Sequence, residues 1–322
     1  MKTFFYSLVL LIGALSFNAV AQTSPPLKIG ANTFVGYGLL YLAQEKGFFK
    51  QQGVDVQIVN TEDKPSTAAA LASGRLDGWV TTVDTFIFYD AKKLGIKQVL
   101  AISLSAGAEG ILATGDITSV AQLKGKRIAV EEGSPAYFFL LNVLADNHLT
   151  QDDVKIVNMK GSDAGAAFVA GKIDVAGTWD PWLGQAGKRN GGHILIDTRQ
   201  KPGLIADTLA LRNEVITNRP QDIEGLIKAY FASYDYWYAH QDEANQIIAK
   251  ASGIPLKDVQ EGLKSVKFGS KQENIDYLLK ADGITRVIEH GVAVYGAAGL
   301  LKQQPKAEDI VDLSLLQSVV KP

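Results

Sequence analysis

The sequence predicts an α/β fold of two lobes, each built on a mainly parallel sheet, with a cleft between the lobes. Three observations predict it. The chain has 322 residues, which is more than one ordinary domain holds. One order of strands and helices occurs twice along the chain. Runs of β-branched and apolar residues alternate with helical patterns, which is typical of βαβ units with helices on both faces of a sheet.

The first residues indicate export. A basic start at Lys2 precedes an apolar run over 4–17, and Ala19-Val20-Ala21 has the small residues that signal peptidase requires. The apolar run is too short to cross about 30 Å of hydrocarbon as a helix. We therefore expect 1–21 to be a cleaved signal peptide and the mature protein, which begins at or near Gln22, to be periplasmic. Because the chain has no cysteine, a lipid anchor is excluded.

Composition excludes several kinds of chemistry. Without cysteine there is no disulfide, thiolate metal site or thiol nucleophile. The net charge is −2 with both signs interspersed, so the chain has no basic stripe for nucleic acid or membrane. The four histidines occur singly, and the sequence has neither a P-loop nor a dinucleotide fingerprint. We expect no metal and no cofactor.

The repeat defines the elements in order. The first copy has strands and helices over 27–30, 39–43, 56–60, 67–71 and 78–82, with a turn at 74–77. The second copy has them over 126–130, 138–144, 154–158 and 164–168, then a turn at 171–174 and a strand that ends at 177–179. Both copies read strand, helix, strand, helix, strand. Each is expected to form one lobe.

The chain is expected to return to the first lobe after the second copy. A strand-like segment over 205–211 follows, and the chain is helical from Pro220 on. Apolar and aromatic residues recur at helical spacing over 222–239, which suits either a ligand platform or, as we favour, helix packing: Leu226, Tyr230, Tyr234 and Trp237. We expect lobe 1 to comprise 22–115 and 203–322, and lobe 2 to comprise 116–202, with crossover strands near 113–117 and 203–207.

Several motifs resemble those of the nitrate, sulfonate and taurine type of periplasmic binding protein of ABC transporters (the NMT1-like family). They are Gly36-Tyr37-Gly38-Leu39, the segment 43–49, the turn 74–78, the segment 123–130, Glu132-Gly133-Ser134 and the segment 178–182. The resemblance covers nearly the whole mature chain. It implies the type II periplasmic binding protein fold, closure on a ligand, and docking onto a membrane permease. The wider fold family includes a pyrimidine synthase and a sulfinate desulfinase that rest on cysteine, which this chain lacks.

Four loops at the carboxyl edges of the predicted strands are candidate ligand contacts, because helix starts there point backbone N–H groups into the cleft. Their candidate residues are Asn32, Tyr37, Thr82, Asp84, Glu132, Ser134, Trp179 and Asp180, with Glu109 in a neighbouring loop. Ser134 and Asp84 can equally serve as helix caps. Trp179 can be core or a flat wall for the solute.

The charge of these loops is acidic. They carry carboxylates and no lysine or arginine, which conflicts with a sulfonate or nitrate ligand and favours an amine- or guanidinium-bearing solute. The alternative is that most of these carboxylates are solvated or cap helices, so the ligand class stays open at this stage.

The main functional hypothesis is a periplasmic solute-binding component of an ABC importer. It would capture a small polar nitrogen- or sulfur-containing metabolite, act with a permease and an ATPase, and be a monomer and not an enzyme. Two alternatives remain: a secreted enzyme on the same fold whose cleft carboxylates act as acid and base, and a periplasmic sensor.

Overall fold

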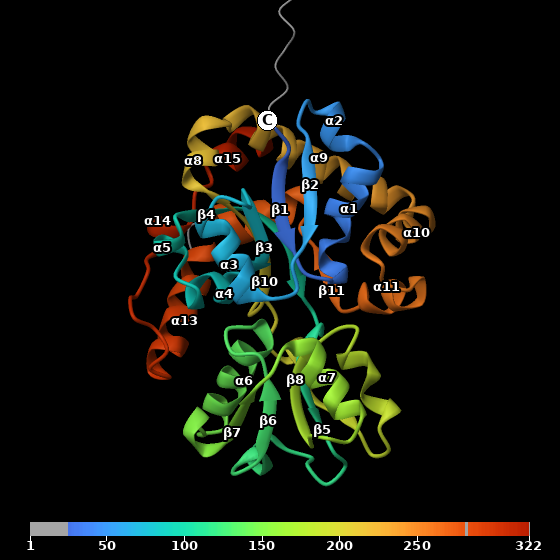
Figure 1. Cartoon of the computed structure of the whole chain (residues 1–322), viewed down its shortest axis with the longest axis vertical. Coiled ribbons are helices and arrows are strands. Elements are labelled where there is room, and N and C mark those ends of the chain that lie inside the picture. Colours follow the sequence, from blue (N-terminus) through green and yellow to red (C-terminus); the bar gives the residue numbers. More distant parts are fainter. Residues whose placement is uncertain (1–24, 281–282, 322) are drawn as a thin grey trace, which may run out of the picture.

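The protein has two lobes, each with its own sheet (Figure 1). The structure is a computed structural model that describes residues 25–280 and 283–321. The expected signal peptide over 1–21 therefore lies outside the described residues. Within the described part of the chain, every helix is too short or too polar to cross a bilayer.

The first lobe is built on a six-stranded sheet in the order β11-β4-β10-β3-β1-β2. Its strands are β1 (Leu27–Ala31), β2 (Val56–Asn60), β3 (Gly78–Thr82), β4 (Ile96–Ser105), β10 (Ala206–Arg212) and β11 (Val266–Phe268). Strand β1 pairs in parallel with β2 and β3, whereas β10 is antiparallel to both of its neighbours. The bounds of β2 and β3 are those that the sequence predicts.

The second lobe has a five-stranded sheet in the order β7-β6-β8-β5-β9. Its strands are β5 (Glu109–Ala113), β6 (Arg127–Val130), β7 (Lys155–Asn158), β8 (Val175–Trp179) and β9 (His193–Asp197). Strand β6 is parallel to β7 and β8, and β5 is antiparallel to β8 and β9. The predicted repeat is thus present in three dimensions, with β6, β7 and β8 arranged as β1, β2 and β3 are.

The two sheets exchange strands. Read from the same edge, they run β2-β1-β3-β10-β4 and β7-β6-β8-β5-β9. Strand β5 follows β4 in the chain but joins the second sheet, and β10 follows β9 but returns to the first. Each sheet therefore has, in its interior, a strand that arrives from the other lobe.

This exchange changes two details of the expected fold. Both sheets are mixed and not mainly parallel, because the arriving strands run antiparallel to the repeat. The chain passes between the sheets at 106–108 and 198–205, and not near 113–117. Strand β5 consequently belongs to the second sheet, although it precedes the boundary expected after 115.

Helices surround both sheets. In the first lobe they are α1 (Gly38–Glu45), α2 (Phe48–Gln51), α3 (Lys64–Ala72), α4 (Val83–Phe88), α5 (Ala91–Leu94), α8 (Asn213–Asn218), α9 (Pro220–Ala239), α10 (Gln241–Ser252), α11 (Leu256–Gly262), α12 (Lys271–Asn274), α13 (Gly283–Ala297), α14 (Ala307–Ile310) and α15 (Ser314–Val320). The second lobe has α6 (Pro135–Asp146) and α7 (Gly161–Val169).

Helix α9 uses its aromatic stripe for packing, as favoured above. Leu226 and Tyr230 are fully buried, and the Tyr230 hydroxyl donates to the carbonyl oxygen of Ile102 in β4 at 2.6 Å. Tyr234 and Trp237 are half-buried at the edge of the same core. The C-terminal third is scaffold for the first lobe.

Helix α13 also connects the lobes, because it packs against α6 of the second lobe. His290 Nε2 lies 2.7 Å from Asn142 Oδ1, and the rings of Tyr295 and Phe138 are 5.2 Å apart. This contact supplements the two chain crossings as a third link between the lobes.

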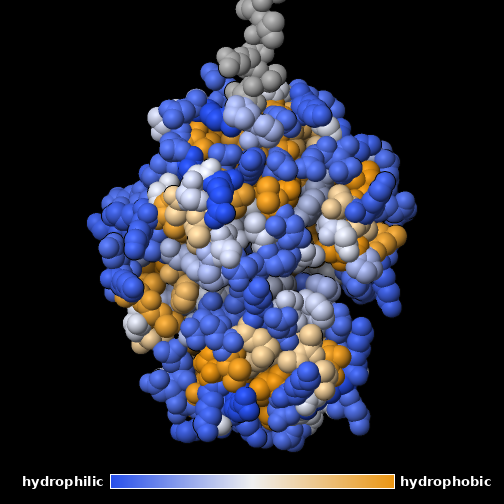
Figure 2. Space-filling view, in the orientation of Figure 1, coloured by the Kyte–Doolittle hydropathy of each residue, from blue (hydrophilic) through white to orange (hydrophobic). Residues whose placement is uncertain are grey.

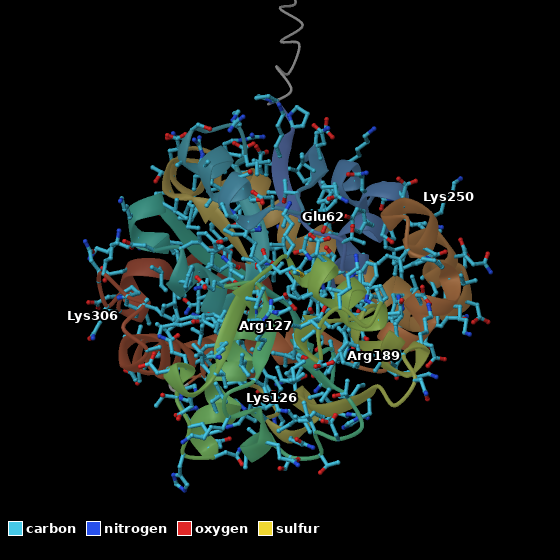
Figure 3. All side chains as sticks on the ribbon, turned by 60° about the horizontal axis from the view of Figure 1, so that its bottom comes forward. Glu62, Lys126, Arg127, Arg189, Lys250 and Lys306 are labelled. Atoms are coloured by element: carbon cyan, nitrogen blue, oxygen red, sulfur yellow. The ribbon has the colours of Figure 1, made fainter. Side chains whose placement is uncertain are left out.

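The surface is mainly hydrophilic where the lobes meet (Figure 2). Its basic side chains are spread over different flanks, as Arg189, Lys250 and Lys306 illustrate (Figure 3).

Candidate functional site

A small cavity lies between the lobes and is lined from both sides. In this arrangement its volume is about 10 Å³, about the space of one water molecule. Its lining residues are Asn32, Phe34, Lys64, Thr81, Glu109, Pro135 and Trp179. The first four belong to the first lobe and the last three to the second. Most lie at the carboxyl edge of a strand or at a helix start, where the strand arrangement leaves a crevice in each lobe.

Of the nine residues that the sequence singles out, three line this cavity: Asn32, Glu109 and Trp179. Asn32 follows β1 directly. Glu109 and Trp179 face one another as register partners of β5 and β8. The indole of Trp179 is 8% exposed and forms an apolar wall.

Three other predicted residues lie buried in the first lobe: Tyr37, Thr82 and Asp84. The Tyr37 hydroxyl donates to Asp207 Oδ1 at 2.9 Å, and the Thr82 hydroxyl bonds that of Thr85 at 2.8 Å. Asp84 Oδ2 receives a weak hydrogen bond from Tyr295 at 3.4 Å. These residues do not line the cavity and are instead buried in the interior of the first lobe.

Ser134 caps helix α6. Its hydroxyl oxygen accepts a hydrogen bond from the backbone N–H of Tyr137 at 3.2 Å, and Pro135 occupies the first turn. Of the two roles considered for this serine, the structure shows the cap.

The last two predicted residues point elsewhere. Glu132 lines a shallow groove beside Tyr137 and Gln151. Asp180 is held by the Ser265 hydroxyl at 2.7 Å and by the Gly184 N–H at 3.0 Å, and it lines a separate groove between the lobes. Of the four carboxylates proposed to face the ligand, only Glu109 lines the central cavity.

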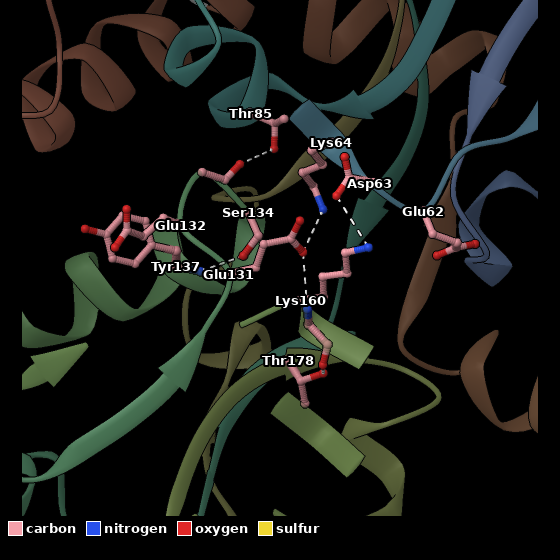
Figure 4. A network of polar contacts seen from close by, with 12 residues as sticks. Glu62, Asp63, Lys64, Thr85, Glu131, Glu132, Ser134, Tyr137, Lys160 and Thr178 are labelled. Atoms are coloured by element: carbon pink, nitrogen blue, oxygen red, sulfur yellow. Dashed lines mark hydrogen bonds and ion pairs between the residues drawn. The ribbon is translucent and has the colours of Figure 1, made fainter. Parts of the chain in front are cut away.

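A lysine that the sequence argument missed is central to the site. Lys64 Nζ lies 3.2 Å from Glu131 Oε2 across the cleft (Figure 4). It also lies 4.7 Å from the centre of the Trp179 ring. The same Glu131 oxygen accepts the Gly161 N–H at 3.2 Å. Both charged side chains are more than nine-tenths buried. The four loops chosen from the sequence predicted a purely acidic cavity wall. Lys64 shows that this prediction is wrong.

The internal repeat could have revealed this lysine. Lys64 and Lys160 both follow the second strand of their copy: Lys64 is the first residue of α3, and Lys160 is the N-cap residue of α7. Lys160 Nζ reaches back to Asp63 Oδ1 of the first lobe at 3.4 Å (Figure 4). Two ion pairs thus cross the cleft in opposite directions. The Lys160 pair is half-exposed, so it contributes little compared with the buried one.

Buried carboxyl groups gather around the site. Asp207 accepts hydrogen bonds from Tyr37 and from Ser103, the latter at 2.7 Å. Burial raises the pKa of Asp84 to about 7 and that of Asp207 to about 6. Burial, followed by the nearby charge of Asp207, also raises the pKa of Glu109 well above its ordinary value. These groups are costly to ionise without a partner.

This cluster predicts how stability depends on pH without ligand. The ordinary pKa of aspartic acid is 3.8, so between about pH 4 and 7 the folded protein holds protons on Asp84 and Asp207 that the unfolded chain has released. The free energy of unfolding should therefore fall as pH rises through this window, by about 1.4 kcal/mol per unit of pKa shift. Urea denaturation at a series of pH values measures it.

The matched variant is Asp84→Asn, whose side chain cannot ionise, and it should flatten the slope. Carboxylates with a lowered pKa, such as Asp63 and Asp153, titrate below the window. A free energy of unfolding that rises with pH over this range, or an unchanged slope in the variant, would contradict this account of the buried cluster.

Comparison with known proteins gives consistent likenesses. A family model described as NMT1/THI5 like matches residues 36–244. The taurine-binding periplasmic protein of Escherichia coli (strain K12) is 26% identical over 236 residues, covering 70% of this chain and 73% of its own length.

Two solved structures share the fold. The alkanesulfonate-binding protein SsuA from Xanthomonas axonopodis pv. citri, bound to MOPS, matches with a TM-score of 0.73 and 23% identity over 91% of this chain and all of its own. The desulfurization enzyme DszB matches with a TM-score of 0.66 and 16% identity, over 91% of this chain and 98% of its own.

Proposed function

Because the chain belongs to the NMT1/THI5-like family, we propose that it is the periplasmic solute-binding component of an ABC importer. The observation that carries the proposal is the cavity between the lobes, whose walls come from both of them. A solute bound there contacts both lobes only when they are closed, so binding and closure are coupled. The ligand is a small polar nitrogen- or sulfur-containing metabolite, in keeping with the taurine-binding relative.

The closed form would be what a permease and its ATPase recognise. We propose a monomer as the working unit. A cleaved signal peptide over 1–21 would place the protein in the periplasm, where the taurine-binding relative is named as residing.

We propose binding without catalysis. The DszB likeness shows that an enzyme can have this fold. In this chain, however, Asp207 is engaged by two hydroxyl groups and Glu131 by a lysine and a backbone N–H. Glu109 is the one carboxyl group among the residues that line the cavity, so the lining offers no pair of carboxyl groups to act as acid and base.

The test is a thermal-shift screen of the mature protein with small sulfonates, nitrate, amino acids, amines and guanidinium compounds. A solute present at 100 times its dissociation constant should stabilise the protein by about 2.7 kcal/mol. Trp179→Ala should abolish most of this shift, because it removes one wall of the cavity. Tyr238→Ala is the matched control, since that ring is 71% exposed.

Mass spectrometry of the same mixtures distinguishes a receptor from an enzyme. Solutes that bind and are recovered unchanged support the receptor. Steady conversion of a bound solute to a product would contradict it and favour a secreted enzyme.

A further inference from the structure

The cavity contains a carboxyl oxygen that the protein leaves unpaired. Glu109 is 2% exposed and lines the cavity, and among the described residues its Oε2 atom has no hydrogen-bond partner. Nearby, the buried Oδ1 of Asp84 also lacks one. A buried acceptor without a donor costs about 1–3 kcal/mol, so such an atom is best explained by a donor that arrives with the ligand.

The surroundings of Glu109 are short of positive charge. Within the described chain, Asp84, Glu109 and Asp207 form no ion pair. The partners of Asp84 and Asp207 are hydroxyl groups, and the one lysine in the cavity wall is already paired with Glu131. An anion would have to take Lys64 from Glu131 and leave that buried carboxylate alone.

Trp179 adds a surface that attracts cations. Lys64 Nζ stands over its ring at 4.7 Å, so the indole already stabilises one ammonium group at this side of the cavity. Glu109 and Trp179 are register partners, so a group bound at the carboxylate lies beside the indole. Within the described residues, no three acidic or histidine side chains gather to hold a metal ion.

We propose that the solute carries a cationic nitrogen group, an ammonium or a guanidinium, whose N–H donates to Glu109 Oε2 beside Trp179. The inference rests on the proposed receptor function and names the class of its solute. It assigns Glu109 as the residue that selects a cation over a sulfonate.

The charged and titratable groups around Glu109 determine whether ligand binding releases protons or takes them up. Asp207 on β10, Asp180 after β8 and Asp84 on α4 act with burial to raise the pKa of Glu109. Tyr37 lies near the same carboxyl group, and Lys64 lines the opposite wall. A bound cation favours the ionised carboxylate and so releases protons, whereas a bound anion favours the protonated form and takes protons up.

The experiment is isothermal titration calorimetry at pH 7 in two buffers of different ionisation enthalpy. The cationic probes are methylguanidinium, ethylammonium and agmatine, and the anionic probes are methanesulfonate and nitrate. Glu109→Gln keeps the size of the side chain but cannot ionise. Glu289→Gln removes the same charge from an exposed position on α13.

At least one cationic probe should bind the wild type with net proton release. Glu109→Gln should weaken that binding about 10- to 100-fold, the range for one charge-assisted hydrogen bond, and Glu289→Gln should not. Proton release is measured on the wild type, so the test does not depend on the folding of a variant.

Three results would overturn the inference. If an anionic probe binds with proton uptake, equally well to Glu109→Gln, and no cation binds, the receptor function stands but the cationic class is wrong. If neither set of probes binds the wild type but an uncharged or anionic solute of the thermal-shift screen does, the receptor function stands and the cationic class is wrong. If no solute of the screen binds, both fail.

Discussion

Phe168→Ala should destabilise the protein by about 3–5 kcal/mol, the usual cost of truncating a fully buried phenylalanine. The second lobe has a small core of its own, made of Leu112, Ala129, Ala164, Phe168, Ile173, Ala176, Leu183 and Ala186. Four of these residues are alanines, so one ring fills much of the core. The guanidinium of Arg189 also lies over that ring at 4.9 Å and would lose its partner.

The measurement is urea denaturation combined with hydrogen exchange. Loss of protection should be greatest in β6, β8 and α7, because the damaged core belongs to the second lobe. Tyr238→Ala, at an exposed position, should stay within about 0.5 kcal/mol of the wild type. A loss below 1 kcal/mol, or one spread evenly over both lobes, would show that this core is not an independent unit.

Lys64→Met should disfavour the closed arrangement by about 3–5 kcal/mol, because it leaves Glu131 buried without its ion-pair partner. Opening the lobes returns Glu131 to water, so the effect should appear as opening and not as unfolding. Small-angle scattering measures it as a larger radius of gyration. Pairs of fluorescent labels, one on each lobe, measure the same change.

The repeat supplies a matched control. Lys160→Met makes the same change just before the equivalent helix α7, but its ion pair with Asp63 is half-exposed and should matter by less than about 1 kcal/mol. The double variant Lys64→Met with Glu131→Gln removes both buried charges and should close again. If the Lys64→Met protein stays closed, or if the double variant is more open than the single one, the buried ion pair does not hold the lobes together.

Much of the fold could be predicted because the strands and helices of the repeat follow from local sequence patterns. Residues 56–60 and 78–82 form strands at the predicted bounds, since short apolar runs between turn residues define them. The mixed direction of the sheets could not be predicted. Which sheet a strand joins depends on where the chain passes from one lobe to the other. Residues 106–108, where it first does so, have no sequence pattern that marks the crossing.

The candidate site was predictable to the level of the loop and not of the side chain. Asn32, Glu109 and Trp179 were found because strand edges mark the crevice. Glu132 and Asp180 lie in loops at the same edges but face other grooves, since one residue along a loop reverses the direction of a side chain. Lys64 was missed because the loop after the second strand of each copy was not considered.

The exchange of β5 and β10 also sets an order of assembly. Strands β5 to β9 form one continuous stretch, so the second sheet is complete as soon as residue 197 has been made. The first sheet is not, because β10 lies between β3 and β4 and comes only with residues 206–212. Until then, no strand joins β3 to β4, and Asp207, which lies on β10, is not yet in place next to the cavity. The lobe that begins the chain is therefore the last to acquire its sheet, and the cavity between the lobes can form only after the second lobe has been built.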